Sequence, residues 1–374
     1  MAVYSSGHEI VGAKIFTNTP QSPVSGDYSN LNGKYLPITT NPKIDVNRPT
    51  SIRQYKNDPG SASFIATRRS KYHDYTAQSA IKDTTASFDI EISALTSNNF
   101  PGLSIFSLVG YYTSNNSYVI TRDITNKVPN INLTMLGKNN EQFILQNSIA
   151  TTININMTTN AILNASVTIE GDNFLRDNSG TDTQTGTPVH DTIEEAHNQI
   201  NNAKPFVLRE LTIEITDKNN PNSPTITTVC PTEFNFSVKS TKSSVEMLSK
   251  NMTVSTLLGV NIEGSFKVLV ENGDYLAPDL VETEAIHKRQ VKVILKDTEN
   301  NHTLFFNFPE LVITNVQDGD GFNNNWSTRE YTFVCLPDSV GNILGVNDNT
   351  TLGNIVTHYG TIVTQDGVPV SNTP

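Results

Sequence analysis

Cysteine, tryptophan and charged residues are all scarce in this chain. Its 374 residues include two cysteines and one tryptophan, and charged residues make up 17% of the sequence. Two thiols cannot build a disulfide framework. The N-terminus, which begins MAVYSSGHEIVG, lacks the basic start and apolar stretch of a secretory signal. We therefore expect Cys230 and Cys335 to be reduced and to serve as small core residues.

Long apolar runs are also absent. No stretch of about 18 apolar residues occurs, so the sequence predicts no membrane-spanning helix and no membrane partner. Hydrophobic residues make up 36% of the chain, and Asn, Thr and Ser fill much of the remainder. Threonine suits strands with a solvated face and asparagine suits loops, whereas helical bundles need Ala, Leu, Glu and Lys. This composition predicts a mainly β protein.

The charge balance argues against nucleic acid as a tightly bound partner. The formal net charge is −11 and the sequence pI is about 5.1. An acidic protein repels the phosphate backbone, so we do not expect tight nucleic-acid binding through general electrostatics. DNA that passes the protein without adhering to it is compatible with this charge.

Catalytic motifs are missing as well. The sequence contains no Gly-x-Ser-x-Gly elbow, no cysteine with a suitable histidine, and no Walker or dinucleotide-binding glycine pattern. No two carboxylates stand out as a glycosidase pair. Clefts that cleave sugars also present several aromatic platforms, and Trp326 is the single tryptophan. We expect no enzyme activity and no cofactor.

Two segments carry residues that bind metals in other settings. Asp318 and Asp320, each followed by glycine, resemble the start of a calcium loop, but Arg329 stands where an EF-hand has its last glutamate. A hairpin tip is the simpler interpretation of this segment. In HDTIEEAHNQ, one histidine, one glutamate and a second histidine share a helix face, without a partner cluster. We expect no metal, with Asp318 and Asp320 as the weak candidates.

Strand-like segments dominate the chain. Alternation is clean in TASFDIEISA, where Phe88, Ile90 and Ile92 face one way. Near-helical spacing predicts a helix at 101–110, and further helices are expected at 192–203 and 274–287. Changes in composition divide the chain into an N-terminal arm at 1–35, a first domain at 36–171, a linker with a short helix at 172–205, a second domain at 206–337 and a C-terminal arm at 338–374.

The same order of strands, helix and hairpin occurs twice. TTASFDIEISA matches IEGSFKVLVEN, which aligns Phe88 with Phe266. EQFILQNSIATTININM matches NHTLFFNFPELVITNVQ, and Ser148 stands in the first copy where Pro309 stands in the second. YLPITTNPKIDV likewise matches VCPTEFNFSVKS, and ILNASVTIEG matches TREYTFVCLP. The repeat has the size of a whole domain rather than of a solenoid unit.

The second copy resembles the tail tube proteins of long-tailed bacteriophages. The resemblance rests on Gly264-Ser265-Phe266, an acidic helix at 274–287, a turn at 297–301, Phe306 and Phe308 with Pro309, Val312 and Ile313, and a closing strand with Tyr331 and Phe333. It covers residues 205–337 well and residues 36–171 loosely. The first copy departs from the pattern, with Ala86 in place of Gly264 and Ser148 in place of Pro309.

The resemblance implies a mainly β (α+β) fold with two tandem tube domains. Each would be a β-sandwich or barrel with a short flanking helix and a long β-hairpin. It implies a virion structural protein, assembled in the host bacterial cytoplasm, whose stacked rings form the channel for DNA ejection. A duplicated chain would form trimeric, pseudo-hexameric rings. The implied partners are other copies of the chain, the tape measure, terminator and distal tail proteins, and DNA in the lumen without sequence-specific binding.

One basic segment is a candidate for contacts between rings. Arg68, Arg69 and Lys71 form the strongest cationic spot in this acidic chain, and a solvated loop is the alternative interpretation. In a tube they would meet an acidic surface on the next ring, for which Asp279, Glu282 and Glu284 are the candidates.

A different function class stays open for the whole chain. The alternative to a tube subunit is a β-sandwich binding module of a tail fibre, surface-layer or carbohydrate-binding protein. Such a module would expose aromatic residues at loop tips. The phenylalanines here lie in strand-like runs, which favours the tube subunit.

Overall fold

The computed structural model confirms a mainly β fold. It describes residues 10–17, 35–40, 42–47, 50–53, 75–78, 83–94, 100–113, 117–121, 131–137, 142–146, 148–171, 173–177, 202–217, 226–247, 252–269, 288–318, 328–339, 341–346, 361–363 and 369–371. The helix expected at 274–287 lies outside these residues. So does the helix expected at 192–203, apart from its last two residues, which form a turn and a bend.

The strands follow one another in two series. The first series comprises β1 (Ile10–Thr17), β2 (Tyr35–Leu36), β3 (Lys43–Asn47), β4 (Thr50–Arg53), β5 (Tyr75–Gln78), β6 (Asp83–Glu91), β7 (Ser93–Ala94), β8 (Tyr111–Thr113), β9 (Ser117–Thr121), β10 (Ile131–Gly137), β11 (Gln142–Gln146), β12 (Ile149–Thr158), β13 (Asn164–Gly171) and β14 (Asn173–Asp177). The second comprises β15 (Lys204–Pro205), β16 (Glu210–Asp217), β17 (Ile226–Val229), β18 (Pro231–Met247), β19 (Met252–Leu269), β20 (Arg289–Asp297), β21 (His302–Asp318), β22 (Thr328–Leu336), β23 (Asn342–Val346), β24 (Thr361–Val363) and β25 (Pro369–Ser371). Segments expected as arms or linker thus contain β1, β14, β15, β23, β24 and β25.

The two series repeat the same antiparallel pairings in the same chain order. In the first, β1 pairs with β2 and β10, β10 with β11, β11 with β14, β12 with β13, β13 with β6, and β6 with β3. In the second, β16 pairs with β17 and β20, β20 with β21, β21 with β23 and β22, β22 with β19, and β19 with β18. The strand pair β11 and β12 therefore corresponds to the single long strand β21.

Ser148 and Pro309 occupy matching places in these two strands. Strand β21 pairs with β20 up to Leu311 and with β22 from Glu310, and β21 has a bulge at Pro309 and Glu310, opposite Gln290 of β20. A bulge is expected there because proline has no N–H to donate. Ser148 separates β11 from β12, and its hydroxyl donates a hydrogen bond to the Leu145 carbonyl at 2.7 Å. At both positions the chain exchanges one partner strand for another.

Matching Ser148 with Pro309 gives an alignment that differs by two residues from the one expected from the sequence. Through the strand registers it places Ile90, not Phe88, at the position of Phe266. A slip of two residues along a strand keeps every side chain on its own face. The alternation pattern therefore could not reveal this shift.

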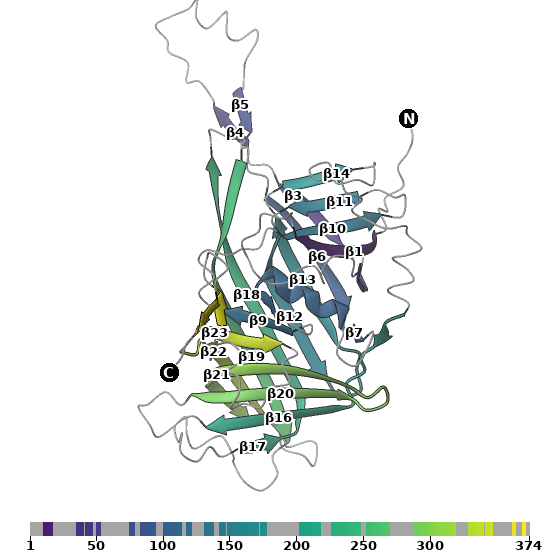
Figure 1. The fold of residues 1–374 in the computed structure, drawn as a ribbon, viewed down its shortest axis with the longest axis vertical. Coiled ribbons are helices and arrows are strands. Elements are labelled where there is room, and N and C mark those ends of the chain that lie inside the picture. The colour runs from purple at the N-terminus through teal and green to yellow at the C-terminus, as the bar shows by residue number, and fades with distance from the viewer. Residues whose placement is uncertain are drawn as a thin grey trace, which may run out of the picture.

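The two series meet in one sheet of 14 strands (Figure 1). Strand β12 pairs with β18 from Thr152 to Thr158, and we call this pairing the joint. Ile155 lies opposite Phe236 and Met157 lies opposite Phe234 across the joint, and all four side chains are buried. The hydrophobic core is consequently continuous from one half of the chain to the other.

The helix expected at 101–110 is present as a 3₁₀ helix, η2 (Pro101–Leu108), and it is buried throughout. It connects the halves, because the Phe106 ring lies 6.3 Å from that of Phe306. The ring of Phe100, just before the helix, lies 5.8 Å from that of Phe206. Strand β9, which follows η2, pairs with β23 of the second series.

The core of the second series is built from phenylalanine. The ring centroid of Phe236 lies 5.1 Å from that of Phe306 and 5.5 Å from that of Phe308, both edge-on, which is a favourable geometry for aromatic pairs. Phe234 and Phe333 pack 5.4 Å apart in the same cluster. These rings hold β18 and β22 of the joined sheet against β21.

The turn between β20 and β21 is organised by a buried carboxylate. Asp297 accepts hydrogen bonds from the backbone N–H groups of Glu299 and Asn300, each at 3.2 Å, and from the Asn300 side chain at 2.8 Å. Burial by itself would raise the pKa of Asp297. The hydrogen bonds outweigh that effect and hold the pKa below its usual value.

Asp297→Asn is expected to reduce stability at neutral pH by about 1 to 2 kcal/mol. Because the folded-state pKa is lowered, the carboxylate stabilises the fold above its unfolded-state pKa of about 4, and this contribution is lost as the pH falls through the folded-state value. The stability of the variant should therefore depend less on pH than that of the native protein as the pH falls below about 5. Urea unfolding across this range measures the difference. The exposed neighbour Glu299, changed to Gln, is the control, and parallel pH profiles for Asp297→Asn and the native protein would contradict the assignment.

Candidate functional surface

One face of the joined sheet carries polar side chains in rows that cross both halves. Directly paired residues in one row are Glu91, Asn164, Asn156, Asn235, Ser265, Thr332 and Asn315, from β6, β13, β12, β18, β19, β22 and β21. The next row comprises the polar residues Asp89, Ser166, Asn154, Ser237 and Glu263 and ends in the apolar residues Val334 and Val312. The joint interrupts neither row. We call this surface the polar face.

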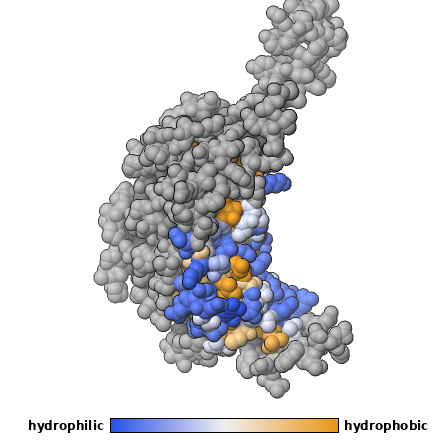
Figure 2. Space-filling view, turned by 90° about the vertical axis from the view of Figure 1, so that its right-hand side faces the viewer, coloured by the Kyte–Doolittle hydropathy of each residue, from blue (hydrophilic) through white to orange (hydrophobic). Residues whose placement is uncertain are grey.

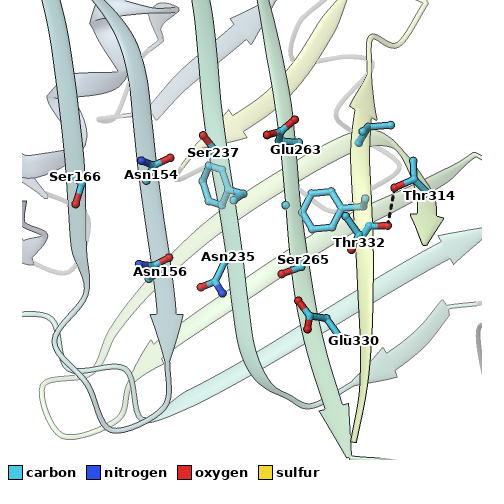
Figure 3. Close-up of a pocket in the computed structure, with 14 residues that line it drawn as sticks. Asn154, Asn156, Ser166, Asn235, Ser237, Glu263, Ser265, Thr314, Glu330 and Thr332 are labelled. Atoms are coloured by element: carbon cyan, nitrogen blue, oxygen red, sulfur yellow. Dashed lines mark hydrogen bonds between the residues drawn. The ribbon is translucent and has the colours of Figure 1, made fainter. Parts of the chain in front are cut away.

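The polar face contains an open depression with a volume of about 790 Å³. Figure 3 shows Asn154 and Asn156 on one strand, Asn235 and Ser237 on the next, and Glu263 beside them. The lining comes from both halves of the chain and consists mainly of amide, hydroxyl and carboxylate groups. Beneath it lie the aromatic residues Phe236 and Phe333, which anchor the sheet.

Carboxylates outnumber lysines on the polar face. The acidic residues are Asp45, Asp89, Glu91, Glu170, Glu233, Glu263 and Glu330, and the basic ones are Lys43, Lys239 and Lys267. Lys239 forms an ion pair with Glu263, and the Asn235 amide donates to Glu233 at 2.6 Å. Burial raises the pKa of Glu91. The excess of carboxylates makes this face repel phosphate near neutral pH.

The polar face is rich in groups that bind water. Among the residues that the structure describes, no group of three His, Cys, Asp or Glu side chains gathers as a metal site. The hydroxyl and amide groups bind water, while the carboxylates discourage a nucleic acid from adhering. In the part of the chain that is described, no helix has the length and apolar character needed to cross a membrane.

Most site residues expected from the sequence lie outside the described residues. This applies to the basic segment with Arg68, Arg69 and Lys71, to Asp279, Glu282 and Glu284, and to Asp320. Asp318 is the last residue of β21, and its side chain is not among those described. The roles expected of these residues remain predictions.

The two cysteines differ in their surroundings. Cys230 is exposed between β17 and β18, so the expectation of a core residue is wrong there. It precedes β18 instead of lying within a strand, and its side chain is therefore not turned into the core. Cys335 on β22 packs against the core, and burial raises the pKa of its thiol. Neither forms a disulfide.

Several strand edges lack a partner strand among the described residues, and two of them border the polar face. From Val312 onward β21 pairs with β22 alone, and β3 pairs with β6 alone. Sequence reasoning missed both edges and the joint. Large exposed apolar side chains are few in the described part of the chain, namely Ile162, Leu258 and Leu269. On the side seen in Figure 2 the described surface is mostly hydrophilic, with apolar residues in small groups.

Comparison with known proteins gives partial matches to solved structures. No protein-family model and no curated protein matches the sequence. A chain of the anti-feeding prophage baseplate, determined with sixfold symmetry, is 13% identical; the match covers 38% of this chain and 95% of that chain with a TM-score of 0.31. A chain from the tail of an empty GTA particle is also 13% identical, covering 34% and 92% with a TM-score of 0.25. The likeness is confined to part of this fold.

Proposed function

We propose that this chain is a structural subunit of a phage-type tail, and that its two halves are duplicated units of a tube wall. The observation that carries the proposal is the joint. It connects two strand series of the same topology edge to edge, so that the polar face and the core both continue across it. The same kind of strand pairing could then form between one chain and the next.

Repeated contacts of this kind close into rings. The joint is heterologous, because it uses the β12 edge of one half and the β18 edge of the other. Heterologous contacts form a closed ring when their rotation divides a full turn. Three copies, each with two halves, would give a ring with six similar units. Closure would also cover the open edges of β3 and β21, which otherwise invite uncontrolled aggregation.

The polar face is suited to line the channel of such a ring. Its carboxylates repel the phosphate backbone, which lets DNA move through without adhering. Long hairpins extend from the body of the subunit. Strands β18 and β19 contain 17 and 18 residues, and β4 and β5 lie at the same end of the molecule (Figure 1). They are candidates for contacts with an adjacent ring and with other tail proteins.

Negative-stain electron microscopy with sedimentation analysis tests this function. We expect concentrated protein to form rings or stacked tubes, and the smallest stable assembly to contain three chains of 41.1 kDa. A monodisperse monomer over the same concentration range would contradict the proposal and favour the binding-module alternative. Dilution series distinguish specific rings from aggregates, because rings dissociate to a defined smaller species.

A further inference from the structure

We propose that two named strand edges form the contact between copies, in a register that the chain itself specifies. Residues 312–315 of β21 in one copy pair antiparallel with 43–45 of β3 in the next copy, with Asn315 opposite Lys43 and Ile313 opposite Ile44. The inference rests on the proposed ring assembly and adds to it the partner surface on each side. The partner is a second copy of this chain.

The joint is the template for this contact. Within one chain Asn154 of β12 lies directly opposite Ser237 of β18, and Ile153 lies opposite Val238. Asn154 is exposed and Ser237 is partly exposed on the polar face, while Ile153 and Val238 are buried in the core. A contact between copies that repeats the joint must use the counterparts of these residues.

The counterpart of Asn154 is Asn315. If Ser148 matches Pro309, the residues that follow them, Ile149 and Glu310, also match. Ile149 lies opposite Glu170 and Glu310 lies opposite Leu336, which fixes how β13 corresponds to β22. Ser166 then corresponds to Thr332. Their partners, Asn154 and Asn315, occupy the same position of the sheet.

The counterpart of Ser237 is Lys43. Val334 of β22 lies opposite Glu263 of β19, and Glu263 lies opposite Ser237 of β18. In the first series, Thr168 of β13 lies opposite Ser87 of β6, and Ser87 lies opposite Lys43 of β3. Because Thr168 corresponds to Val334 in the register above, Ser237 corresponds to Lys43, and Val238 to Ile44.

Both edges are suited to the pairing. Among the described residues, β3 has a neighbouring strand on one side only, and so does β21 beyond Leu311. Lys43 and Asn315 are exposed on the polar face, while Ile44 and Ile313 face the core. Ile44 is only partly buried in the single chain, and pairing would place it beside Ile313. The contact therefore extends the core and the polar face together, as the joint does.

The edges of β3 and β21 do not pair with each other within one chain. They lie at opposite ends of the strand order β21, β22, β19, β18, β12, β13, β6 and β3. Each has the side-chain alternation that the other requires, since apolar residues fall on the same face of both. This complementarity identifies a second copy as the occupant, rather than an unrelated partner with its own pattern.

Paired cysteines test the register. In a background with Cys230→Ser and Cys335→Ala, Lys43→Cys with Asn315→Cys should form disulfides between copies in assembled protein. Directly opposed residues bring their β-carbons near the separation that a disulfide requires. Lys43→Cys with Gln317→Cys is the off-register control, because it moves one thiol about 6.6 Å along the strand. We expect about tenfold more cross-linked product from the first pair.

An internal pair calibrates the experiment. Asn154→Cys with Ser237→Cys spans the joint, so it should form a disulfide within one chain whether or not rings are present. Cross-linking of Lys43→Cys with Asn315→Cys, in particles that microscopy shows as rings, supports the proposed contact. Rings in which only the internal pair reacts, or in which the off-register pair reacts equally well, overturn the contact but leave the ring proposal intact. Absence of rings overturns the proposed function itself.

Discussion

Phe236→Ala is expected to lower the free energy of unfolding by about 4 kcal/mol. Phe236 is 2% exposed and packs edge-on against Phe306 and Phe308. It also lies opposite Ile155 in the joint, so its loss opens a cavity where the two halves meet. Truncation of a large buried side chain costs the transfer free energy of the removed atoms and the energy of the remaining cavity. Chemical denaturation followed by far-UV circular dichroism gives the change directly.

Ser237→Ala is the matched control for this substitution. Ser237 is the next residue on the same strand and faces the polar side of the sheet. Its hydroxyl makes no hydrogen bond with the described residues, so its removal leaves no partner unpaired. We expect a change within about 0.5 kcal/mol. Similar destabilisation by both substitutions would show that Phe236 does not anchor the joint.

Gly264→Ala is expected to destabilise the protein by about 2 to 3 kcal/mol, although it adds a single carbon. A β-carbon at this position would overlap the carbonyl oxygen of Asn235 and the ring of Phe333, and would lie 3.0 Å from the α-carbon of Phe236. The Phe333 ring occupies the space that a side chain at 264 would need. Backbone atoms of β18 cannot move aside without disturbing the pairing of β18 with β19.

Gly259→Ala, in the same strand, provides the comparison. A β-carbon there meets nothing within 4 Å. The substitution should be neutral or stabilise by a few tenths of a kcal/mol, because alanine restricts the unfolded chain. Thermal unfolding of both variants measures the contrast. Equal melting temperatures for the two would contradict the close approach at Gly264.

Local pattern predicted much of this fold. The alternation in TASFDIEISA correctly indicated β6, with Phe88 and Ile90 buried and Asp89 and Glu91 partly exposed. The helical segment at 101–110 was located correctly, because its apolar spacing and Pro101 favour a helix start. The 3₁₀ form was not predictable, because apolar spacing of this kind does not separate a short 3₁₀ helix from an α-helix.

The joint could not be predicted from the sequence. Strand β12 reads IATTININMT, and this alternation fits an edge strand as well as a central one. Which edges meet depends on tertiary packing, here of Ile155 and Met157 against Phe236 and Phe234. Strand β14, with the sequence NFLRD, was hidden in an expected linker because five residues carry little periodic signal.

End-on images of assembled particles test most directly whether the joint repeats between chains. Class averages refined without imposed symmetry should show a ring of six similar units in which alternate units are identical, which is threefold symmetry with a near-sixfold outline. Each unit should be joined to the next through one continuous sheet. A ring built from any number of chains other than three, or one whose chains meet away from β3 and β21, would contradict the account.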